Sequence, residues 1–424
     1  MIPFVRRFPG AALPCLVLLF SLLSLGIGGE ARARPSEAPG VAVRAGKVLT
    51  MDDEDRVFDH AVILIREGRI QAVGPEAEVP VPEGYEVIDA REHWVVTGLV
   101  DYHSHIGGNL SDLNDAVYLT NPGLRVDECF KPDNPAVRDA RADGITTLLL
   151  IPGSAVNMSG FGLMYKSAGR TLEECAVTDP GCIKMAQAGN PERYWYGVGR
   201  SYMNWNLRAT LRRLKAYHEA WCAYEEGERK SPPPFDPACE PFRDLFRGRL
   251  PTCMHTQIYQ VCMMTMLMMH DEFGFWTVPT HSTFDAYLLA PLVAARNMVV
   301  IAGPRNIYFD RRTRRINGVP ARWARGGVKW LGTDTDAPVV PIEEHTFQAA
   351  LACRFGWEPY PALKGITRVT AKGAMIDGRV GSIEPGKDGD LGVWTGDPLD
   401  PRSWCVLTLV NGRVAYDARK GRRY

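Results

Sequence analysis

The sequence predicts an α/β protein with a (β/α)8 barrel, the TIM barrel, and a small β-sandwich-like domain built from both chain ends. Three observations support this fold class. Short apolar runs alternate with segments of helical character through the middle of the chain, which is typical of βα units and a parallel sheet. Short alternating strands broken by turns occupy the two ends instead. The 424 residues suffice for one barrel with an accessory domain.

The small domain is predicted from residues 41–74 and 381–417. In the first segment Glu67-Gly68-Arg69 marks a hairpin turn, and in the second Asn411-Gly412 is a strong signal for a two-residue hairpin. Because both segments are rich in strands and lie at opposite ends of the chain, we expect them to form one composite domain. The predicted limits are 40–97 plus 378–424 for this domain and 98–377 for the barrel.

The barrel prediction depends on eight apolar runs that read as strands. The third run is preceded by a glycine-rich segment and is therefore also compatible with a loop. In order, the runs are 93–105, 144–154, 161–167, 182–189, 250–257, 275–283, 298–304 and 328–336.

Polar residues fall late in these runs, where the catalytic groups of a barrel cluster. His103 and His105 lie one residue apart, so in a strand they project toward the same face. The chain has only nine histidines, and four of them occupy such positions. The pattern therefore predicts one site at the barrel mouth, made of His103, His105, Lys184, His255, His281 and Asp334. Imidazoles and carboxylates suit zinc, and also iron or manganese.

The chain resembles the amidohydrolase superfamily, and most closely its imidazolonepropionase-like and dipeptidase-like branches. The resemblance spans about Val41 to Tyr416. Its most specific parts are TGLVDYHSH at 97–105 and the segment 366–394, which contains PGKDGD, while GITT at 144–147 and GTD at 332–334 add weaker support. Thr97 stands where many relatives carry proline. The loop 152–162 lacks the GGQ of one branch, which leaves substrate specificity open.

The resemblance implies a site for one or two divalent metal ions. Its ligands would be His103 and His105 on the first strand, a carboxylated Lys184, the single histidines His255 and His281, and Asp334. Lys166 on the preceding strand competes with Lys184 for the role of bridging lysine. Without carboxylation we expect one ion, because an ammonium group has no lone pair to offer.

The expected reaction is hydrolysis of a C–N bond in an amide, a peptide-like substrate or a cyclic amide by metal-activated water. Asp334 is the expected general acid/base, which takes a proton during attack and returns it to the leaving nitrogen. Asp336 shares its strand face and is the alternative base. A lactonase or phosphotriesterase on the same site, and an inactive metal-binding relative, stay open. The sequence identifies no substrate-binding residues.

The N-terminus has the order of a secretory signal peptide at residues 1–33. Arg6-Arg7 precedes an apolar core from about Ala11 to Ile27, and Ala31-Arg32-Ala33 offers a cleavage site. We expect a periplasmic or secreted protein with no stable membrane span after cleavage. An uncleaved anchor is the alternative, since the apolar core approaches the length that spans a bilayer.

The balance of charged residues limits the kinds of binding partner that the sequence predicts. The 49 basic and 49 acidic residues cancel, so nothing indicates a nucleic-acid partner, and a small molecule or short peptide is the expected substrate. A homo-oligomer is compatible with the sequence. Nine cysteines follow the signal, an odd number without a CxxC motif. Cys175 with Cys182, and Cys222 with Cys239, are near enough in sequence to close short disulfide loops, but the sequence does not fix the pairing.

Overall fold

The computed structural model describes residues 39–187, 190, 198–304 and 306–421. Residues from Pro39 onward form one compact unit, so the predicted limits at 97 and 378 stay predictions. The predicted signal peptide lies outside the described residues. Within the described part of the chain, no helix combines the length and the apolarity needed to cross a bilayer.

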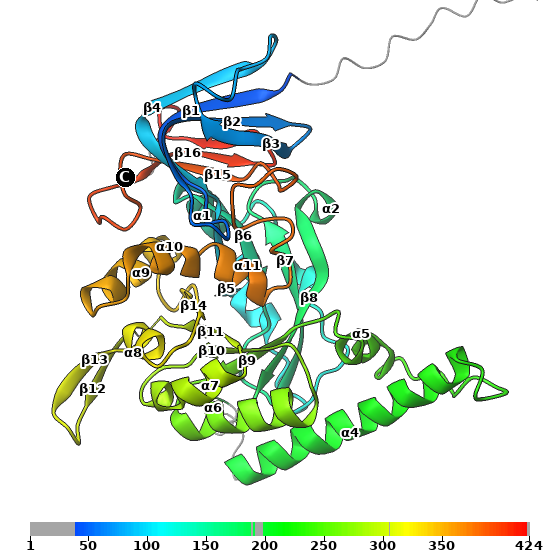
Figure 1. Cartoon of the computed structure of the whole chain (residues 1–424). Coiled ribbons are helices and arrows are strands. Elements are labelled where there is room, and N and C mark those ends of the chain that lie inside the picture. Colours follow the sequence, from blue (N-terminus) through cyan, green and yellow to red (C-terminus); the bar gives the residue numbers. More distant parts are fainter. Residues whose placement is uncertain (1–38, 188–189, 191–197, 305, 422–424) are drawn as a thin grey trace, which may run out of the picture. The chain divides into compact units, whose positions relative to one another are not determined.

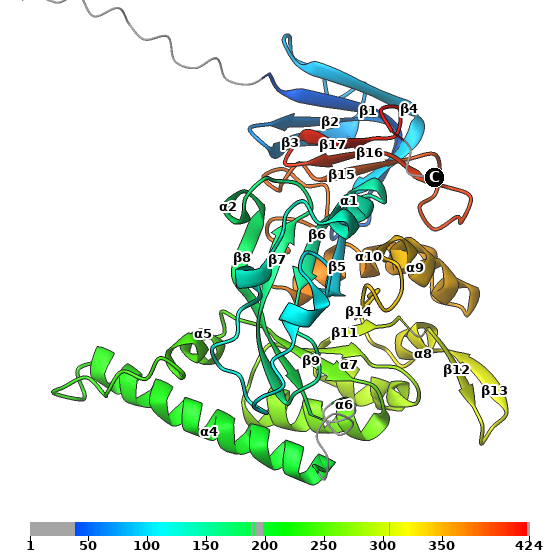
Figure 2. The ribbon, with the colours of Figure 1, turned by 180° about the vertical axis from the view of Figure 1, so that it is seen from behind.

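A seven-stranded sheet unites the two chain ends in the order β17-β16-β15-β4-β1-β2-β3 (Figures 1 and 2). Strand β15, from the C-terminal segment, pairs antiparallel with β4 from the N-terminal segment, which confirms the predicted composite sheet. Both predicted turns have positive φ values, at Glu67 and Gly68 and at Asn411 and Gly412. The strands are β1 (Val41–Leu49), β2 (Val57–Arg66), β3 (Arg69–Pro75), β4 (Glu86–Thr97), β15 (Leu391–Trp394), β16 (Cys405–Val410) and β17 (Arg413–Asp417).

All eight predicted barrel runs contribute a strand to an eight-stranded sheet of order β14-β11-β10-β9-β8-β7-β6-β5, which confirms the predicted barrel. The first run divides at Gly98, where β4 of the small sheet gives way to β5. The strands are β5 (Leu99–Ser104), β6 (Ile145–Leu150), β7 (Met158–Lys166), β8 (Ala176–Ala186), β9 (Thr252–Thr256), β10 (Thr277–His281), β11 (Val299–Ala302) and β14 (Trp330–Thr333).

Strand β7 departs from the all-parallel sheet that the sequence predicted. It runs antiparallel to both β6 and β8, while the other paired strands of this sheet run parallel. The physical reason is the length of the connections. Only residues 151–157 join β6 to β7, and the short helix α2 (Leu172–Cys175) lies between β7 and β8. A parallel crossover needs about a dozen residues or more.

Helices and short turns connect the remaining strands. The longest helix is α4 (Arg200–Glu225), and the π-helix η4 (Met266–Glu272) continues α6 (Tyr259–Thr265). The hairpin β12 (Ile307–Asp310) and β13 (Arg315–Gly318) follows β11. The other α-helices are α1 (Pro135–Ala142), α5 (Arg243–Phe246), α7 (Ala290–Ala295), α8 (Val319–Arg325), α9 (His345–Arg354), α10 (Pro359–Gly365) and α11 (Arg368–Gly373). The 3-10 turns are η1 (Leu110–Leu113), η2 (Val126–Cys129), η3 (Glu240–Phe242), η5 (Ala286–Leu289) and η6 (Ile342–Glu344).

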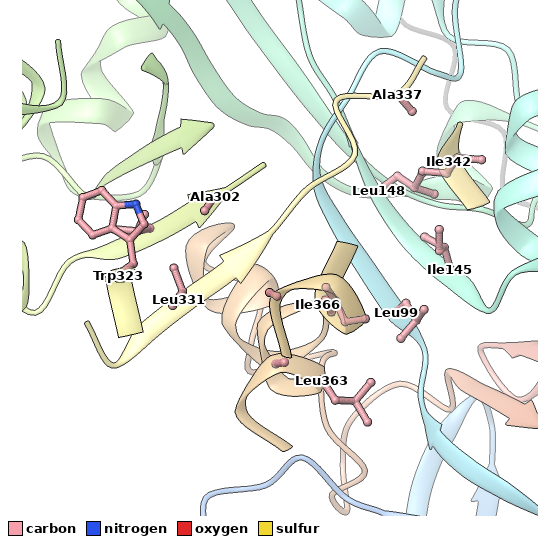
Figure 3. Close-up of a cluster of buried hydrophobic side chains, with 14 of the residues drawn as sticks. Leu99, Ile145, Leu148, Ala302, Trp323, Leu331, Ala337, Ile342, Leu363 and Ile366 are labelled. Atoms are coloured by element: carbon pink, nitrogen blue, oxygen red, sulfur yellow. The ribbon is translucent and has the colours of Figure 1, made fainter. Parts of the chain in front are cut away.

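The eight-stranded sheet leaves one junction, between its edge strands β5 and β14, without a strand ladder among the described residues. We call this junction the seam. Apolar side chains from both edges pack there: Leu99 of β5 and Leu331 of β14 belong to one buried cluster with Leu363 and Ile366 (Figure 3). The N–H of Val100 donates to the carbonyl of Ile366 at 2.9 Å. The chain after α10 thus fills the seam where strand pairing is missing.

The nine cysteines that follow the predicted signal are all free thiols. Neither pair that is close in sequence, Cys175 with Cys182 or Cys222 with Cys239, forms a disulfide within the described structure. Most of these thiols are buried, where burial raises the pKa of Cys262 to about 11 and that of Cys405 to about 12. Such thiols behave as small apolar side chains.

Candidate metal centre

The six residues singled out in the sequence meet at the carboxyl-terminal ends of the barrel strands. The ring centroids of His103 and His281 lie 4.4 Å apart, and those of His255 and His281 lie 4.6 Å apart. The Lys184 Nζ lies 3.0 Å from the His103 Nε2. Asp334 directly follows β14, and its Oδ2 lies 3.9 Å from the His103 Nδ1. The structure thus brings residues from opposite ends of the barrel sequence into one cluster.

Ligand-type atoms form two groups that share His103. One group contains His103, His281 and Asp334, which are all buried. The other contains His103, His105 and Asp336, with the Asp336 Oδ1 at 3.2 Å from the His105 Nε2. In each group the ligand atoms lie within 4.8 Å of one another, a spacing at which one ion can contact all three.

Backbone carbonyls orient two of the imidazoles. The Nδ1 of His105 donates to the carbonyl of Ile151 at 2.9 Å, and the Nδ1 of His281 donates to that of Gly303 at 3.0 Å. A carbonyl oxygen only accepts, so each Nδ1 carries the proton and the neutral ring keeps its lone pair on Nε2. This arrangement is the one that metal-ligating histidines use.

Several buried atoms of the cluster lack a hydrogen-bond partner among the described residues. They are both ring nitrogens of His255, the Nε2 of His281 and both carboxylate oxygens of Asp334. Burying polar atoms without partners costs about 1–3 kcal/mol each. Because these atoms are imidazole nitrogens and carboxylate oxygens that converge on one place, the donor set fits a divalent cation.

The electrostatics of the cluster favour neutral imidazoles at two positions. Burial, together with the neighbouring imidazoles and Lys184, lowers the pKa of His255 well below its usual value. Burial and the neighbouring His103 likewise lower the pKa of His281 to about 3. Both rings are therefore in the uncharged form that binds metals.

The two carboxyl groups of the cluster differ. Burial raises the pKa of Asp334 well above its usual value, and the negative charges of Asp336 and Asp101 raise it further, against the influence of His103. For Asp336, burial also acts to raise the pKa, but the neighbouring imidazoles of His281, His103 and His105 outweigh burial and lower it. Asp334 is thus the carboxyl group with the greater proton affinity.

The backbone around the cluster is unusual. His281, Ser282 and Asp336 have φ values of 66°, 42° and 51°, in the left-handed region that residues other than glycine avoid. Such conformations cluster at functional sites because the surrounding structure must hold them. Gly303 has no side chain where a Cβ would lie 2.8 Å from the Oδ1 of Asp334, so glycine gives that carboxylate its room.

The two candidate lysines occupy different environments. Lys184 is fully buried, and within the described structure no carboxylate lies at ion-pair distance from its Nζ. Lys166, in contrast, forms ion pairs with Asp388, at 2.9 Å, and with Asp390. Because β7 is antiparallel, Lys166 at its end pairs with Thr147 near the start of β6, away from the strand ends that carry the cluster.

Sequence reasoning missed part of this arrangement. Asp336 was considered only as an alternative base, yet it contacts both His103 and His105. Asp101 was not considered, although it is fully buried and its Oδ2 accepts a hydrogen bond from the Thr335 hydroxyl at 2.5 Å. The alternation of Asp101, His103 and His105 along one strand was the available signal.

Comparison with known proteins extends these observations. No protein-family model matches the sequence. The chain is 26% identical over 396 residues to the amidohydrolase tasK of Hapsidospora irregularis, a match that covers 84% of this chain and 40% of that protein. It is 25% identical over 399 residues to an imidazolonepropionase of Maricaulis maris, covering 88% of this chain and 96% of that one.

Among solved structures, an amidohydrolase from Thermotoga maritima MSB8 is similar with a TM-score of 0.78 and 29% sequence identity, covering 89% of this chain and all of that chain. The similarity therefore includes both the barrel and the sheet that the chain ends build. Together with the converging histidines and aspartates, these likenesses identify the chain as a member of the amidohydrolase superfamily.

Proposed function

We propose that this protein is a metal-dependent hydrolase that cleaves a C–N bond of an amide, a peptide-like substrate or a cyclic amide. The observation that carries the proposal is the convergence of buried, unpartnered ligand atoms from His255, His281 and Asp334. The names of two relatives, amidohydrolase and imidazolonepropionase, support the same class of reaction.

The residues that would hold the metal are His103, His105, His255, His281 and Asp334, and zinc is the ion we propose. Iron and manganese suit the same nitrogen and oxygen donors. A divalent ion supplies two things that amide hydrolysis lacks at neutral pH: it lowers the pKa of water and it polarises a carbonyl group.

Asp334 is the proposed general acid/base. Its unpartnered carboxylate oxygens are free to accept a proton, and burial raises the pKa of this carboxyl group, which favours holding that proton until the leaving nitrogen takes it. Asp336 is less suited to this role, because its Oδ1 already faces the Nε2 atoms of both His103, at 3.4 Å, and His105, at 3.2 Å.

Lys184 is the proposed bridging residue in its carboxylated form. A buried ammonium without a carboxylate partner is costly, and the nearby imidazoles add no compensating negative charge. Reaction of its neutral amine with carbon dioxide gives a carbamate and releases one proton, which turns the side chain into an anionic oxygen ligand.

Zinc content tests this step. Protein grown with bicarbonate should hold two ions per chain and Lys184→Met fewer, whereas one ion in both would contradict the bridge.

Amine release from a panel of dipeptides and cyclic amides tests the proposed reaction. Zinc-loaded protein should release amine from at least one member, and Asp334→Asn should not. Hydrolysis of lactones or phosphotriesters with no amide turnover would assign the site to a different electrophile. Zinc binding without turnover of any panel member would indicate an inactive relative.

Export through residues 1–33 is also part of the proposal. The order of charged, apolar and small residues in this segment supports it. N-terminal sequencing of the protein from cell fractions tests it: a mature chain that begins at Arg34 in the periplasm or medium is expected, and a full-length cytoplasmic chain would contradict it.

A further inference from the structure

The seam between β5 and β14 separates the candidate ligands into two halves. His103 and His105 lie at the end of β5, and Asp334 and Asp336 directly follow β14. Their contacts cross the seam: the His103 Nε2 lies 3.4 Å from the Asp336 Oδ1, and the His103 Nδ1 lies 3.9 Å from the Asp334 Oδ2. Ladders hold each of the other neighbouring strands of the sheet together, but the described residues form no ladder here.

A short polar network crosses the seam at the level of the ligands. The Oδ1 of Asp101 accepts from the backbone N–H of His103 at 3.1 Å, and its Oδ2 accepts from the Thr335 hydroxyl at 2.5 Å. The Thr335 Oγ1 in turn accepts from the N–H of Ala337 at 3.1 Å. The carbonyl of Ala337 then accepts from the N–H of His105 at 2.7 Å, which closes the circuit back to β5.

The network involves the backbone of both ligand-bearing segments. Asp101 and Thr335 are both fully buried, and Ser104 forms a bridge with Ala337. A fully buried carboxylate is an expensive acceptor, and a neutral side chain could satisfy the same N–H at lower cost. Its two hydrogen bonds at this junction indicate a role in geometry, because a charge-assisted hydrogen bond is shorter and stronger than a neutral one.

We propose that Asp101 and Thr335 form a clasp that positions the two halves of the metal centre across the seam. Neither side chain is assigned as a ligand or as a proton carrier. Asp101 fixes the backbone at His103 directly, and Thr335 connects Asp101 to the turn that follows Asp334 and Asp336. The inference rests on the proposed metal site, since the quantity that the clasp controls is the distance between ligands on opposite sides of the seam.

Competition for Zn²⁺ between the protein and a chromophoric chelator measures the clasp without any need for turnover. Thr335→Val removes the hydroxyl at nearly constant volume and leaves Asp101 Oδ2 and the Ala337 N–H without partners. We expect its apparent Zn²⁺ affinity to fall about 10- to 100-fold, the usual effect of losing a group that orients ligands. Thr335→Ser restores the hydroxyl and should return the affinity to within about threefold of wild type.

Thr408→Val is the matched control. Thr408 is also fully buried, and its hydroxyl donates to the Arg141 carbonyl at 2.7 Å between the small sheet and α1, outside the network of Asp101 and Thr335. This variant should lose thermal stability and keep the Zn²⁺ affinity of wild type. A merely structural role for Thr335 would give Thr335→Val the same behaviour as Thr408→Val, and that result would overturn the clasp.

Two further outcomes keep the test decisive. If Thr335→Val does not fold, Thr335→Ala replaces it, because alanine also lacks the hydroxyl that donates to the Asp101 Oδ2; unchanged Zn²⁺ affinity in that variant overturns the clasp. A wild-type chain that takes up no Zn²⁺ overturns the proposed function and the clasp together. A wild type that binds Zn²⁺, with equal affinity in all variants, overturns the clasp alone.

Discussion

At the scale of single residues, the two carboxylates that follow β14, Asp334 and Asp336, lie in different environments. The Asp336 Oδ1 lies 3.4 Å from the His103 Nε2 and 3.2 Å from the His105 Nε2, whereas neither oxygen of Asp334 has a hydrogen-bond partner among the described residues. Burial separates their pKa values further, raising that of Asp334, while the surrounding imidazoles lower that of Asp336. Pairs of carboxyl groups whose environments separate their pKa values commonly divide acid and base roles in this way.

Asp334→Asn should therefore fold, keep Zn²⁺ and lose about 10²- to 10⁴-fold in kcat, the contribution of a positioned general acid/base. Steady-state kinetics with zinc content measured on the same samples checks this. Asp400→Asn, at an exposed ion pair with Arg402, is the matched control for the chemical change. If Asp336→Asn loses kcat with its zinc intact while Asp334→Asn does not, the role belongs to Asp336.

At the scale of elements, the reversed direction of β7 places the two candidate lysines of neighbouring strands, Lys166 and Lys184, in different environments. Lys184 on β8 ends beside His103, and Lys166 on β7 ends beside Asp388 and Asp390. The direction of one strand thus decides which lysine can reach the site. It also leaves Lys166 as the cation that neutralises two buried carboxylates next to the small sheet.

Lys166→Met should destabilise the protein by about 3–5 kcal/mol, because it leaves the buried Asp390 without its cation, while Asp388 keeps its ion pairs with Arg69 and Arg379. Its kcat, measured well below the unfolding temperature, should stay near that of wild type. Lys184→Met is the comparison: with both proteins chelated it should lose little stability, and with zinc added it should show a large loss of activity. Urea unfolding and kinetics on both variants check the pair, and equal effects on kcat would contradict the assignment.

The sequence predicted the strands of the barrel because each is a buried apolar run, and buried runs are visible without knowing their neighbours. It did not predict the direction of β7, because alternation has the same period in parallel and antiparallel strands. The length of the connection 151–157 was the only signal. The positions of His255 and His281 late in their strands were visible, whereas the link between Asp101 and Thr335 joins residues far apart in the chain and depends on how the barrel closes.

At the scale of the whole molecule, the candidate metal centre joins the edges of the barrel sheet. Its ligands come from both sides of the seam and from strands β9 and β10 between them. A metal bound there would connect elements that are distant in sequence. Binding to the folded state alone stabilises a protein by RT ln(1 + [L]/Kd), about 4 kcal/mol at a thousandfold excess over Kd.

Removal of the metal should therefore lower Tm by several degrees, and added Zn²⁺ should restore it. Differential scanning calorimetry of chelated and zinc-reconstituted protein measures the shift. His255→Ala is the control, since loss of this ligand should make Tm much less sensitive to Zn²⁺. An identical Tm for the chelated and reconstituted wild type would mean that the buried ligand atoms do not hold a metal.

The most direct measurement is a titration of Zn²⁺ into chelated wild-type protein, with amine release from the amide panel followed at each step. We predict negligible release before zinc is added, and then a rise in proportion to bound zinc that levels off at one or two ions per chain. Full amide hydrolysis by the chelated protein, unchanged by zinc, would contradict it.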